Sequence, residues 1–294
     1  MGKLIRIITN DGAVLASAVN STDIVSEIEK IHKTSAVITA ALGRLATGAV
    51  LISSMMKEEG NSVTLRINGG GPAGSLIAVA GKDRCVKAYP QNPVVEIPLN
   101  PKGKLDVGKA VGTDGLLSVV RDTGVGEPHT GYCNITTGEI GDDITSYFAS
   151  SEQIPTVCAL GVLVNPDLTC RSAGGIFIQL LPGADDSVID KLEANLSNMK
   201  SVSSMVDEGF SPLDMLKEAL KGFELEVIDD DEAGYKCDCS VERVERALVS
   251  LGAEELQKMI DEEEEISVQC HFCNKKYTFS KEKLNFLKKC KKKD

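Results

Sequence analysis

The sequence has no Trp, only 4% aromatic residues and none of the long uncharged apolar runs that mark membrane proteins. Residues 1–12 reach Asn10 and Asp11 before an apolar segment of secretory length can form. The longest apolar stretch, residues 35–56, is interrupted by Arg44 and several Ser and Thr, which favours a buried helix over a membrane span. We therefore expect a cytoplasmic protein with no signal peptide and no membrane partner.

The chain also has fewer basic than acidic residues. The chain has 32 Lys and Arg against 43 Asp and Glu, a formal net charge of −11. Because an acidic protein repels a phosphate backbone, we expect no nucleic-acid partner. The Lys-rich end, residues 281–293, is the exception, and we expect it to be a solvated tail rather than an RNA-binding segment.

Recognisable catalytic signatures are missing as well. His32 and His129 have no Cys or carboxylate neighbours at metal-ligand spacing, and no Ser-His-Asp or Cys-His arrangement can be assigned. Gly69, Gly71 and Gly74 match a dinucleotide-binding pattern, but a proline interrupts the loop and a strand, not a helix, is expected next. The glycines therefore predict a turn, and we expect a protein that is not an enzyme.

The remaining pattern predicts an α+β fold. Residues 1–183 form an expected N-terminal domain in which strands and helices occur in blocks rather than in regular alternation, giving a mixed sheet packed with helices. Helices are expected at residues 22–32, 35–56 and 139–151. Strands are expected at residues 3–9, 13–19, 62–68, 75–80, 85–89, 94–97, 116–122, 132–135, 156–164 and 175–181.

The sequence pattern of residues 184–232 predicts a helical linker. From residue 185 to 206, apolar side chains recur at helical spacing and form one stripe: Val188, Ile189, Leu192, Leu196, Met199, Val202 and Val206. A short helix should follow from Ser211, a good N-cap with Pro212 at the first helical position, to Leu220. The stripe is either ordinary core or a partner-binding surface. An acidic run, residues 229–232, separates this linker from the end of the chain.

Residues 233–294 form a third expected domain, built on cysteine. In a cytosolic chain, nine cysteines favour thiols and metal binding over a disulfide framework. Four of them form two close pairs, Cys237 with Cys239 and Cys270 with Cys273, separated by two predicted helices. Two chelating pairs match a tetrahedral Zn²⁺ site, in which four thiolates leave no open position for a substrate. On the spacing alone, a purely structural zinc ribbon is the alternative interpretation.

The other candidate ligands and thiols have simpler interpretations. His271 is an alternative to one of the four thiols as a zinc ligand. Cysteines in or beside predicted strands are expected to be small buried apolar side chains. These are Cys85, Cys133, Cys158 and Cys170. Cys290 is expected to be exposed in the Lys-rich tail and not to take part in the site.

Longer stretches of the sequence resemble a known family. The segment from Cys237-Asp238-Cys239-Ser240 to Cys270-His271-Phe272-Cys273, followed by Tyr277-Thr278-Phe279, resembles the redox domain of the heat-shock protein 33 family of bacterial chaperones. Three further motifs resemble that family in the same order: Gly70-Gly71-Pro72, residues 151–156, and Ala173-Gly174-Gly175 followed by residues 179–182. The resemblance covers essentially the whole chain.

The resemblance implies a redox-regulated, ATP-independent holdase chaperone. In the reduced form Cys237, Cys239, Cys270 and Cys273 would bind zinc as thiolates, and the chaperone would be inactive. Oxidation would pair Cys237 with Cys239 and Cys270 with Cys273 and release the metal. The active form would dimerise and capture unfolding client proteins.

The stripe in the linker is the expected client-binding surface. Without zinc, the C-terminal domain would lose its main stabilising interaction, and the linker would lose a neighbour that keeps its apolar side chains covered. The client-binding residues are then expected to include Leu192, Leu196, Met199, Val202 and Val206. Two rival functions stay open: a constitutive zinc-ribbon adaptor for protein or nucleic acid, and a thiol-disulfide oxidoreductase that uses Cys270 and Cys273.

Overall fold

The computed structural model describes residues 1–56, 58, 60–262 and 265–290, without the side chains of residues 289 and 290. Its contacts divide the chain into two compact units. We call Met1–Lys236 the body and Cys237–Asp294 the cysteine module. The segment that was expected as a separate linker, residues 184–232, therefore lies within the body.

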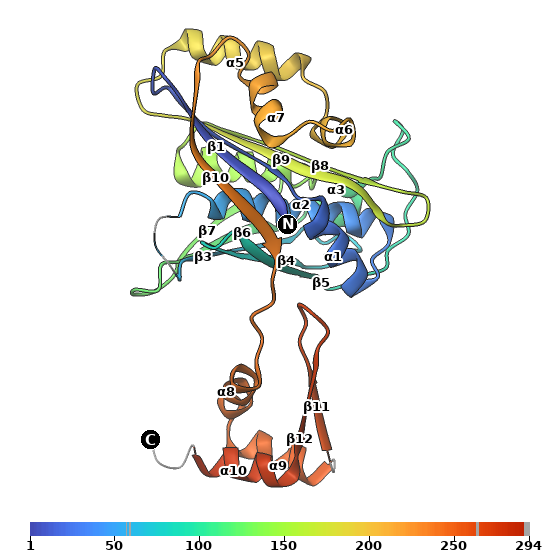
Figure 1. Ribbon diagram of the computed structural model, residues 1–294. Coiled ribbons are helices and arrows are strands. Elements are labelled where there is room, and N and C mark those ends of the chain that lie inside the picture. Colours follow the sequence, from blue (N-terminus) through green and yellow to red (C-terminus); the bar gives the residue numbers. More distant parts are fainter. Residues whose placement is uncertain (57, 59, 263–264, 291–294) are drawn as a thin grey trace. The chain divides into compact units, whose positions relative to one another are not determined.

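The body is built on one mixed sheet of ten strands (Figure 1). Its order is β7-β6-β3-β4-β5-β10-β1-β2-β9-β8, and neighbouring strands are antiparallel except β10 and β5, which pair in parallel. The strands are β1 (Gly2–Thr9), β2 (Val14–Asn20), β3 (Ser62–Asn68), β4 (Leu76–Gly81), β5 (Cys85–Pro90), β6 (Leu116–Asp122), β7 (His129–Asn134), β8 (Thr156–Val164), β9 (Cys170–Leu180) and β10 (Leu225–Tyr235).

Strand β10 joins two halves of this sheet. It pairs along its length with β1, but it meets β5 only through Gly234 opposite Cys85 and Tyr235 opposite Val86. The sheet thereby folds into two layers, and helices α1 (Thr22–His32) and α2 (Ala36–Ser53) lie between them (Figure 1). The result is an inner core enclosed on both sides by strands.

Helix α2 occupies the centre of that inner core. All its residues except Ala36 and Arg44 are buried, as expected for a helix surrounded by protein rather than one that lies on a surface. By length and composition it is the one helix among the described residues that could cross a membrane, but 89% of it is buried inside the body. The prediction of a buried helix is confirmed. Three shorter elements close the ends of the core: α3 (Val107–Val111), α4 (Gly141–Tyr147) and the π-helical turn η1 (Phe148–Glu152).

Three helices cover the other face of the layer that contains β1, β2, β8 and β9 (Figure 1). They are α5 (Asp186–Asn198), α6 (Val202–Asp207) and α7 (Pro212–Ala219). With the outer face of the strands they enclose a second apolar core around Ile5, Ile176 and Met215, which we call the outer core. Ser211 caps α7 by accepting a hydrogen bond from the amide of Asp214, as the sequence predicts.

The cysteine module has a small core of its own. It consists of α8 (Val241–Leu251), α9 (Ala253–Glu262), the antiparallel pair β11 (Glu265–Gln269) and β12 (Lys276–Ser280), and α10 (Lys281–Cys290). Leu248, Leu256, Tyr277 and Leu284 are among the side chains buried in this core. The prediction of a solvated Lys-rich tail is therefore wrong for residues 281–288, because Leu284 and Leu287 give α10 a buried face. Residues 291–293 and the side chain of Cys290 lie outside the described residues.

Three other expectations need correction. The strand expected at residues 94–97 is irregular chain, because the side chain of Ser35 bonds both backbone groups of Val95 in place of a strand partner. Residues 185–206, expected to carry one apolar stripe at helical spacing, form two helices, because Met199 is extended and Ser201 caps a new helix at Val202. The acidic run at residues 229–232 is not a spacer but part of β10.

The Gly-rich turn is confirmed. Residues 69–74 connect β3 to β4, and no helix follows them. A Cβ atom at Gly69 would lie 2.0 Å from the carbonyl oxygen of Gly112, and one at Gly71 would lie 2.4 Å from that of Ala110. The glycines are needed because two backbone segments approach each other closely here, which gives this loop a structural role.

Candidate metal centre

The local fold of the cysteine module places each cysteine. Cys237 and Cys239 lie on a segment without regular secondary structure that ends where Ser240 caps α8 by accepting a hydrogen bond from the amide of Arg243. Cys270 and Cys273 lie in the turn between β11 and β12. Two backbone hydrogen bonds close that turn, from the amide of Cys270 to the carbonyl of Lys275 and from the amide of Asn274 to the carbonyl of Cys270, both 2.9 Å.

The four sulfur atoms form one cluster. All lie within 4.8 Å of one another. The Sγ atoms of Cys237 and Cys270 are 3.7 Å apart, and those of Cys239 and Cys273 are 3.3 Å apart. Four sulfurs at the usual zinc bond length of about 2.3 Å would be separated by about 3.8 Å at the corners of a tetrahedron. The cluster therefore fits a metal ion, and it is formed by thiols alone, without His271.

The environment makes the four thiols unequal. Burial raises the pKa of Cys237 and of Cys273. Burial acts in the same direction on Cys239, but hydrogen bonds from the Tyr277 hydroxyl and the neighbouring thiols outweigh it and lower the pKa of Cys239 to about 7. The Tyr277 hydroxyl lies 3.0 Å from the Cys239 sulfur. In the metal-free cluster, Cys239 is thus the site where negative charge is best stabilised.

The cysteines of the body have a different character. All the described cysteines are free thiols. Cys133 and Cys158 are buried, as expected, whereas Cys85 and Cys170 are partly exposed. Burial raises the pKa of Cys133 and of Cys170 to about 11 and raises those of Cys85 and Cys158 as well. Because the thiolate is the reactive form, these four cysteines are poor nucleophiles at neutral pH.

The expected client-binding residues lie in the outer core of the body. Leu192 on α5 and Val202 and Val206 on α6 are buried, and Leu196 and Met199 are partly buried against the same cluster. Their partners include Ile5 and Ile176 on the sheet and Met215 on α7. The stripe is therefore covered in this conformation.

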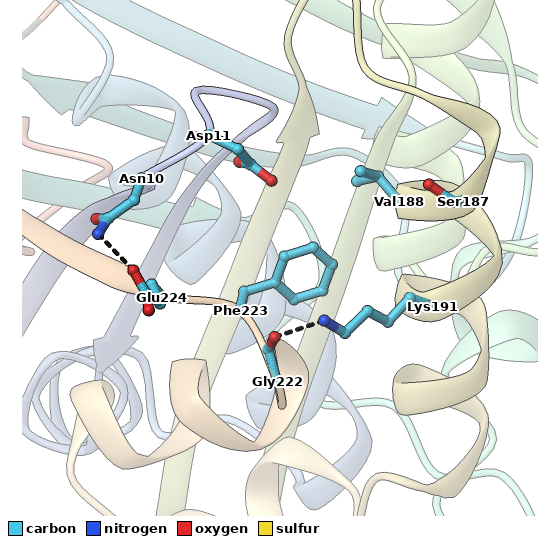
Figure 2. A pocket seen from close by; sticks show the side chains of 8 residues that line it. All are labelled: Asn10, Asp11, Ser187, Val188, Lys191, Gly222, Phe223 and Glu224. Atoms are coloured by element: carbon cyan, nitrogen blue, oxygen red, sulfur yellow. Dashed lines mark hydrogen bonds between the residues drawn. The ribbon is translucent and has the colours of Figure 1, made fainter.

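Helix α5 is the least buried of the three covering helices, with Leu192 as its one buried side chain. Polar contacts attach it to the turn between α7 and β10 (Figure 2). The Lys191 ammonium donates to the carbonyl of Gly222 at 2.5 Å and lies 4.1 Å from the centre of the Phe223 ring. The side chain of Asn195 donates to the carbonyl of Lys221 at 3.0 Å.

A pocket of about 440 Å³ opens beside this attachment (Figure 2). It is lined by Asn10 and Asp11 from the β1–β2 turn, by the first turns of α5, and by the turn that leads into β10. Its apolar walls are Val188 and Phe223, both at the edge of the outer core. Packing is therefore incomplete at this end of α5.

Sequence reasoning missed Tyr277 as a partner of the cysteines. On β12, Tyr277 and Phe279 alternate with exposed residues and point into the module core. That alternation is visible in the sequence, but strands β11 and β12 were not expected, so nothing placed the Tyr277 hydroxyl near Cys239. The sequence signal for this contact would have been a tyrosine on a short strand directly after the second cysteine pair.

Comparisons with known proteins agree with one another. A family model described as Hsp33 protein matches residues 2–280. The chain is 48% identical over 281 residues to the 33 kDa chaperonin of Lachnoclostridium phytofermentans, covering 96% of each chain. It is 44% identical over 288 residues to the 33 kDa chaperonin of Bacillus subtilis, covering 98% of each.

A solved structure extends the similarity to the fold. The crystal structure of the 33 kDa chaperonin of Thermotoga maritima, a heat-shock protein 33 homologue, superposes with a TM-score of 0.90 at 36% identity and covers 99% of both chains. Motifs, family model, full-length relatives and fold thus indicate the same family, and the chain belongs to the Hsp33 family.

Proposed function

We propose that this protein is a redox-regulated holdase chaperone that binds unfolding proteins without ATP and without catalysis. Zn²⁺ on Cys237, Cys239, Cys270 and Cys273 keeps it inactive. Oxidation of these thiols releases the metal and activates the protein in the cytoplasm under oxidative stress. The observation that carries this proposal is a four-thiol cluster in a module with a small core, in a chain whose body keeps an apolar stripe covered.

The chemistry of the cluster suits such a switch. Thiolates are the oxidisable form of cysteine, and a bound metal would hold all four in that form. Oxidation to two disulfides, Cys237 with Cys239 and Cys270 with Cys273, removes the ligands. Structural zinc contributes about 10–16 kcal/mol of apparent binding free energy in small domains, which is comparable to the stability of a whole domain. Loss of the metal is therefore expected to unfold the cysteine module.

Strand β10 offers a route from the module to the stripe. It ends at Tyr235, two residues before Cys237, and its other end follows directly on the turn that anchors α5. Unfolding of the module frees the end of β10. Displacement of β10 then removes the turn on which Lys191 and Asn195 depend, and α5 and α6 can uncover their apolar side chains.

The exposed surface would bind clients and a second copy of the chain. Leu192, Leu196, Met199, Val202 and Val206 supply apolar contacts to unfolding proteins, and the oxidised form is a homodimer. Relatives named chaperonins support the client role. The acidic charge of the chain disfavours nucleic acid as a partner.

A single titration tests the proposal. The reduced protein is treated with increasing peroxide or hypochlorite while zinc release, free thiols and suppression of client aggregation are followed together. We expect the three to change in step. An adaptor with a constitutive zinc ribbon would lose metal without gaining activity, and an oxidoreductase would turn over a small disulfide substrate.

The client surface has its own test. Leu196→Ser places a hydroxyl in the stripe at a partly buried position, so the oxidised variant should suppress client aggregation less well than the oxidised wild type. Ala194→Ser on the exposed side of the same helix is the matched control and should behave like wild type. Unchanged suppression by Leu196→Ser would argue against this part of the surface.

A further inference from the structure

Tyr277 occupies a specific position between the core of the cysteine module and the thiols. It lies opposite Val268 in the β11–β12 pair, and only 5% of it is exposed. The Lys275 ammonium lies 5.2 Å from the centre of its ring. The ring packs in the core, while the hydroxyl reaches the Sγ of Cys239 at 3.0 Å.

The hydrogen bond from Tyr277 distinguishes Cys239 from Cys237 and Cys273. Cys237 and Cys273 accept hydrogen bonds from backbone amides, those of Cys239 and Lys275. Cys239 accepts a hydrogen bond from a side-chain hydroxyl that the module core fixes in place. A backbone donor is the same in any sequence, whereas this donor depends on one side chain.

A hydroxyl donor acts on a metal-bound thiolate in two ways. It orients the sulfur, as hydrogen-bond partners of metal ligands generally do, and loss of such a partner typically costs 10–100-fold in metal affinity. It also withdraws electron density from the sulfur, which weakens attack on an oxidant. Hydrogen bonds to cluster sulfurs tune the redox properties of iron–sulfur sites in the same sense.

We propose that Tyr277 is a positioning residue that holds Cys239 toward the metal and restrains its oxidation. The hydroxyl thereby sets how readily the Cys237–Cys239 half of the site opens. The inference rests on the proposed function, because it requires a metal-bound, oxidisable cluster.

The restrained step is the reaction of Cys239 with a peroxide. The thiolate of Cys239 attacks one oxygen of hydrogen peroxide, the O–O bond breaks, and the products are a sulfenic acid on Cys239 and hydroxide. The thiolate of Cys237 then attacks the Cys239 sulfur, a disulfide forms, and a second hydroxide leaves. Two thiolates are oxidised and one peroxide is reduced. The Tyr277 hydrogen bond opposes the first attack.

Tyr277→Phe removes the hydroxyl and keeps the ring. With the full-length protein, we expect zinc affinity in a chelator competition to fall by about tenfold or more. Under limiting peroxide, zinc release should be faster, and thiol trapping with mass spectrometry should show the added oxidation at Cys237 and Cys239 rather than at Cys270 and Cys273. In the Co²⁺-substituted protein, the sulfur-to-cobalt absorption should move to longer wavelength.

Two controls separate positioning from packing. Phe279→Leu perturbs the same strand and the same core, so it should lower the thermal stability of the module without moving the cobalt absorption. Incorporation of 3-fluorotyrosine at position 277 strengthens the donor and should slow zinc release. It also provides the test if Tyr277→Phe does not fold.

The outcomes distinguish the inference from the proposed function. If the wild type binds metal and releases it on oxidation, but neither substitution at position 277 changes the rate, the cobalt absorption or the oxidised pair, the role of Tyr277 is refuted. If the wild-type reduced protein binds neither Zn²⁺ nor Co²⁺, the proposed function itself fails. Equal acceleration at all four cysteines would also overturn the inference, because it would indicate general loosening of the module.

Discussion

The four thiols of the cluster are best understood as one titrating group. Their sulfurs lie within 4.8 Å of one another, so the proton on each depends on the charge of the others. Burial raises the pKa of Cys237 and Cys273, while hydrogen bonds bring that of Cys239 to about 7. At neutral pH the metal-free cluster therefore holds several protons that a metal must displace.

This protonation gives zinc binding a defined pH dependence. Because the thiols are protonated in the free state and deprotonated in the bound state, metal binding releases protons and weakens as the pH falls. Each displaced proton changes the affinity tenfold per pH unit, and below pH 7 Cys239 joins the protonated Cys237 and Cys273, so we expect zinc affinity to fall at least about a hundredfold between pH 7 and 6. Competition with a chelator of known protonation constants measures it. Affinity that does not change over this interval would contradict the assignment of the ligands.

Residue types and spacing were sufficient to predict the candidate ligands but not their surroundings. The two pairs Cys237-Cys239 and Cys270-Cys273 can be found in the sequence because short-range chelation depends on spacing alone. The contact between Tyr277 and Cys239 joins residues 38 positions apart, and it depends on which face of a two-stranded sheet points inward. Such a contact depends on how distant segments pack together, and the residues next to Tyr277 or Cys239 in the sequence do not reveal that packing.

Among the elements, β10 shows why an acidic run can be misinterpreted. Consecutive carboxylates usually indicate a solvated segment, but here three of the four each have a cationic partner elsewhere in the body. Arg6 contacts Asp229, Lys3 contacts Asp230 at 3.1 Å, and the buried Arg84 contacts Asp231 at 3.0 Å. The cations lie far away in the sequence, so local composition could not reveal the strand. Strands β3, β6 and β8, with regular patterns and clear Gly or Pro boundaries, were predicted at their observed limits.

Helix α5 is expected to be the first covering helix to detach, and Lys191 provides a test. Lys191→Met keeps the aliphatic chain over Phe223 but removes the donor to Gly222, which is worth about 1 kcal/mol for a typical hydrogen bond. Hydrogen exchange in residues 186–198 of the reduced protein should then accelerate about fivefold. Lys217→Met on α7 removes the same charge nearby and should leave exchange in α5 unchanged. Equal acceleration in both variants would point to charge rather than to this contact.

At the scale of the whole molecule, the two units differ in how much core each possesses. The body encloses one core between its sheet layers and another beneath α5–α7, whereas the cysteine module has a single small cluster around Leu248, Leu256 and Leu284. A core of this size is in the range where a metal supplies much of the stability. The sequence did not show that residues 184–236 belong to the body, because their contacts with β1, β2 and β9 join residues far apart in the chain.

Removal of the metal should therefore affect the units unequally. After treatment of the reduced protein with a strong chelator, limited proteolysis should cut the chain within residues 237–290 while a fragment containing residues 1–180 survives. Addition of Zn²⁺ before the protease should restore the protection, and Mg²⁺, which prefers oxygen ligands, should not. If the module resists digestion equally with and without metal, its core is sufficient alone and the metal is not its main stabiliser.

The position of β10 in the middle of the sheet has a consequence for what an activated molecule can bind. A strand at the edge of a sheet leaves one neighbour unpaired when it departs, but β10 lies between β1 and β5. Its departure would free the backbone amides and carbonyls of β1 along its length and those of β5 at Cys85 and Val86, and such edges accept an extended polypeptide regardless of its sequence. Clients would then bind through backbone hydrogen bonds as well as through apolar side-chain contacts. Backbone hydrogen bonding suits clients that share no sequence motif and have only their unfolded state in common.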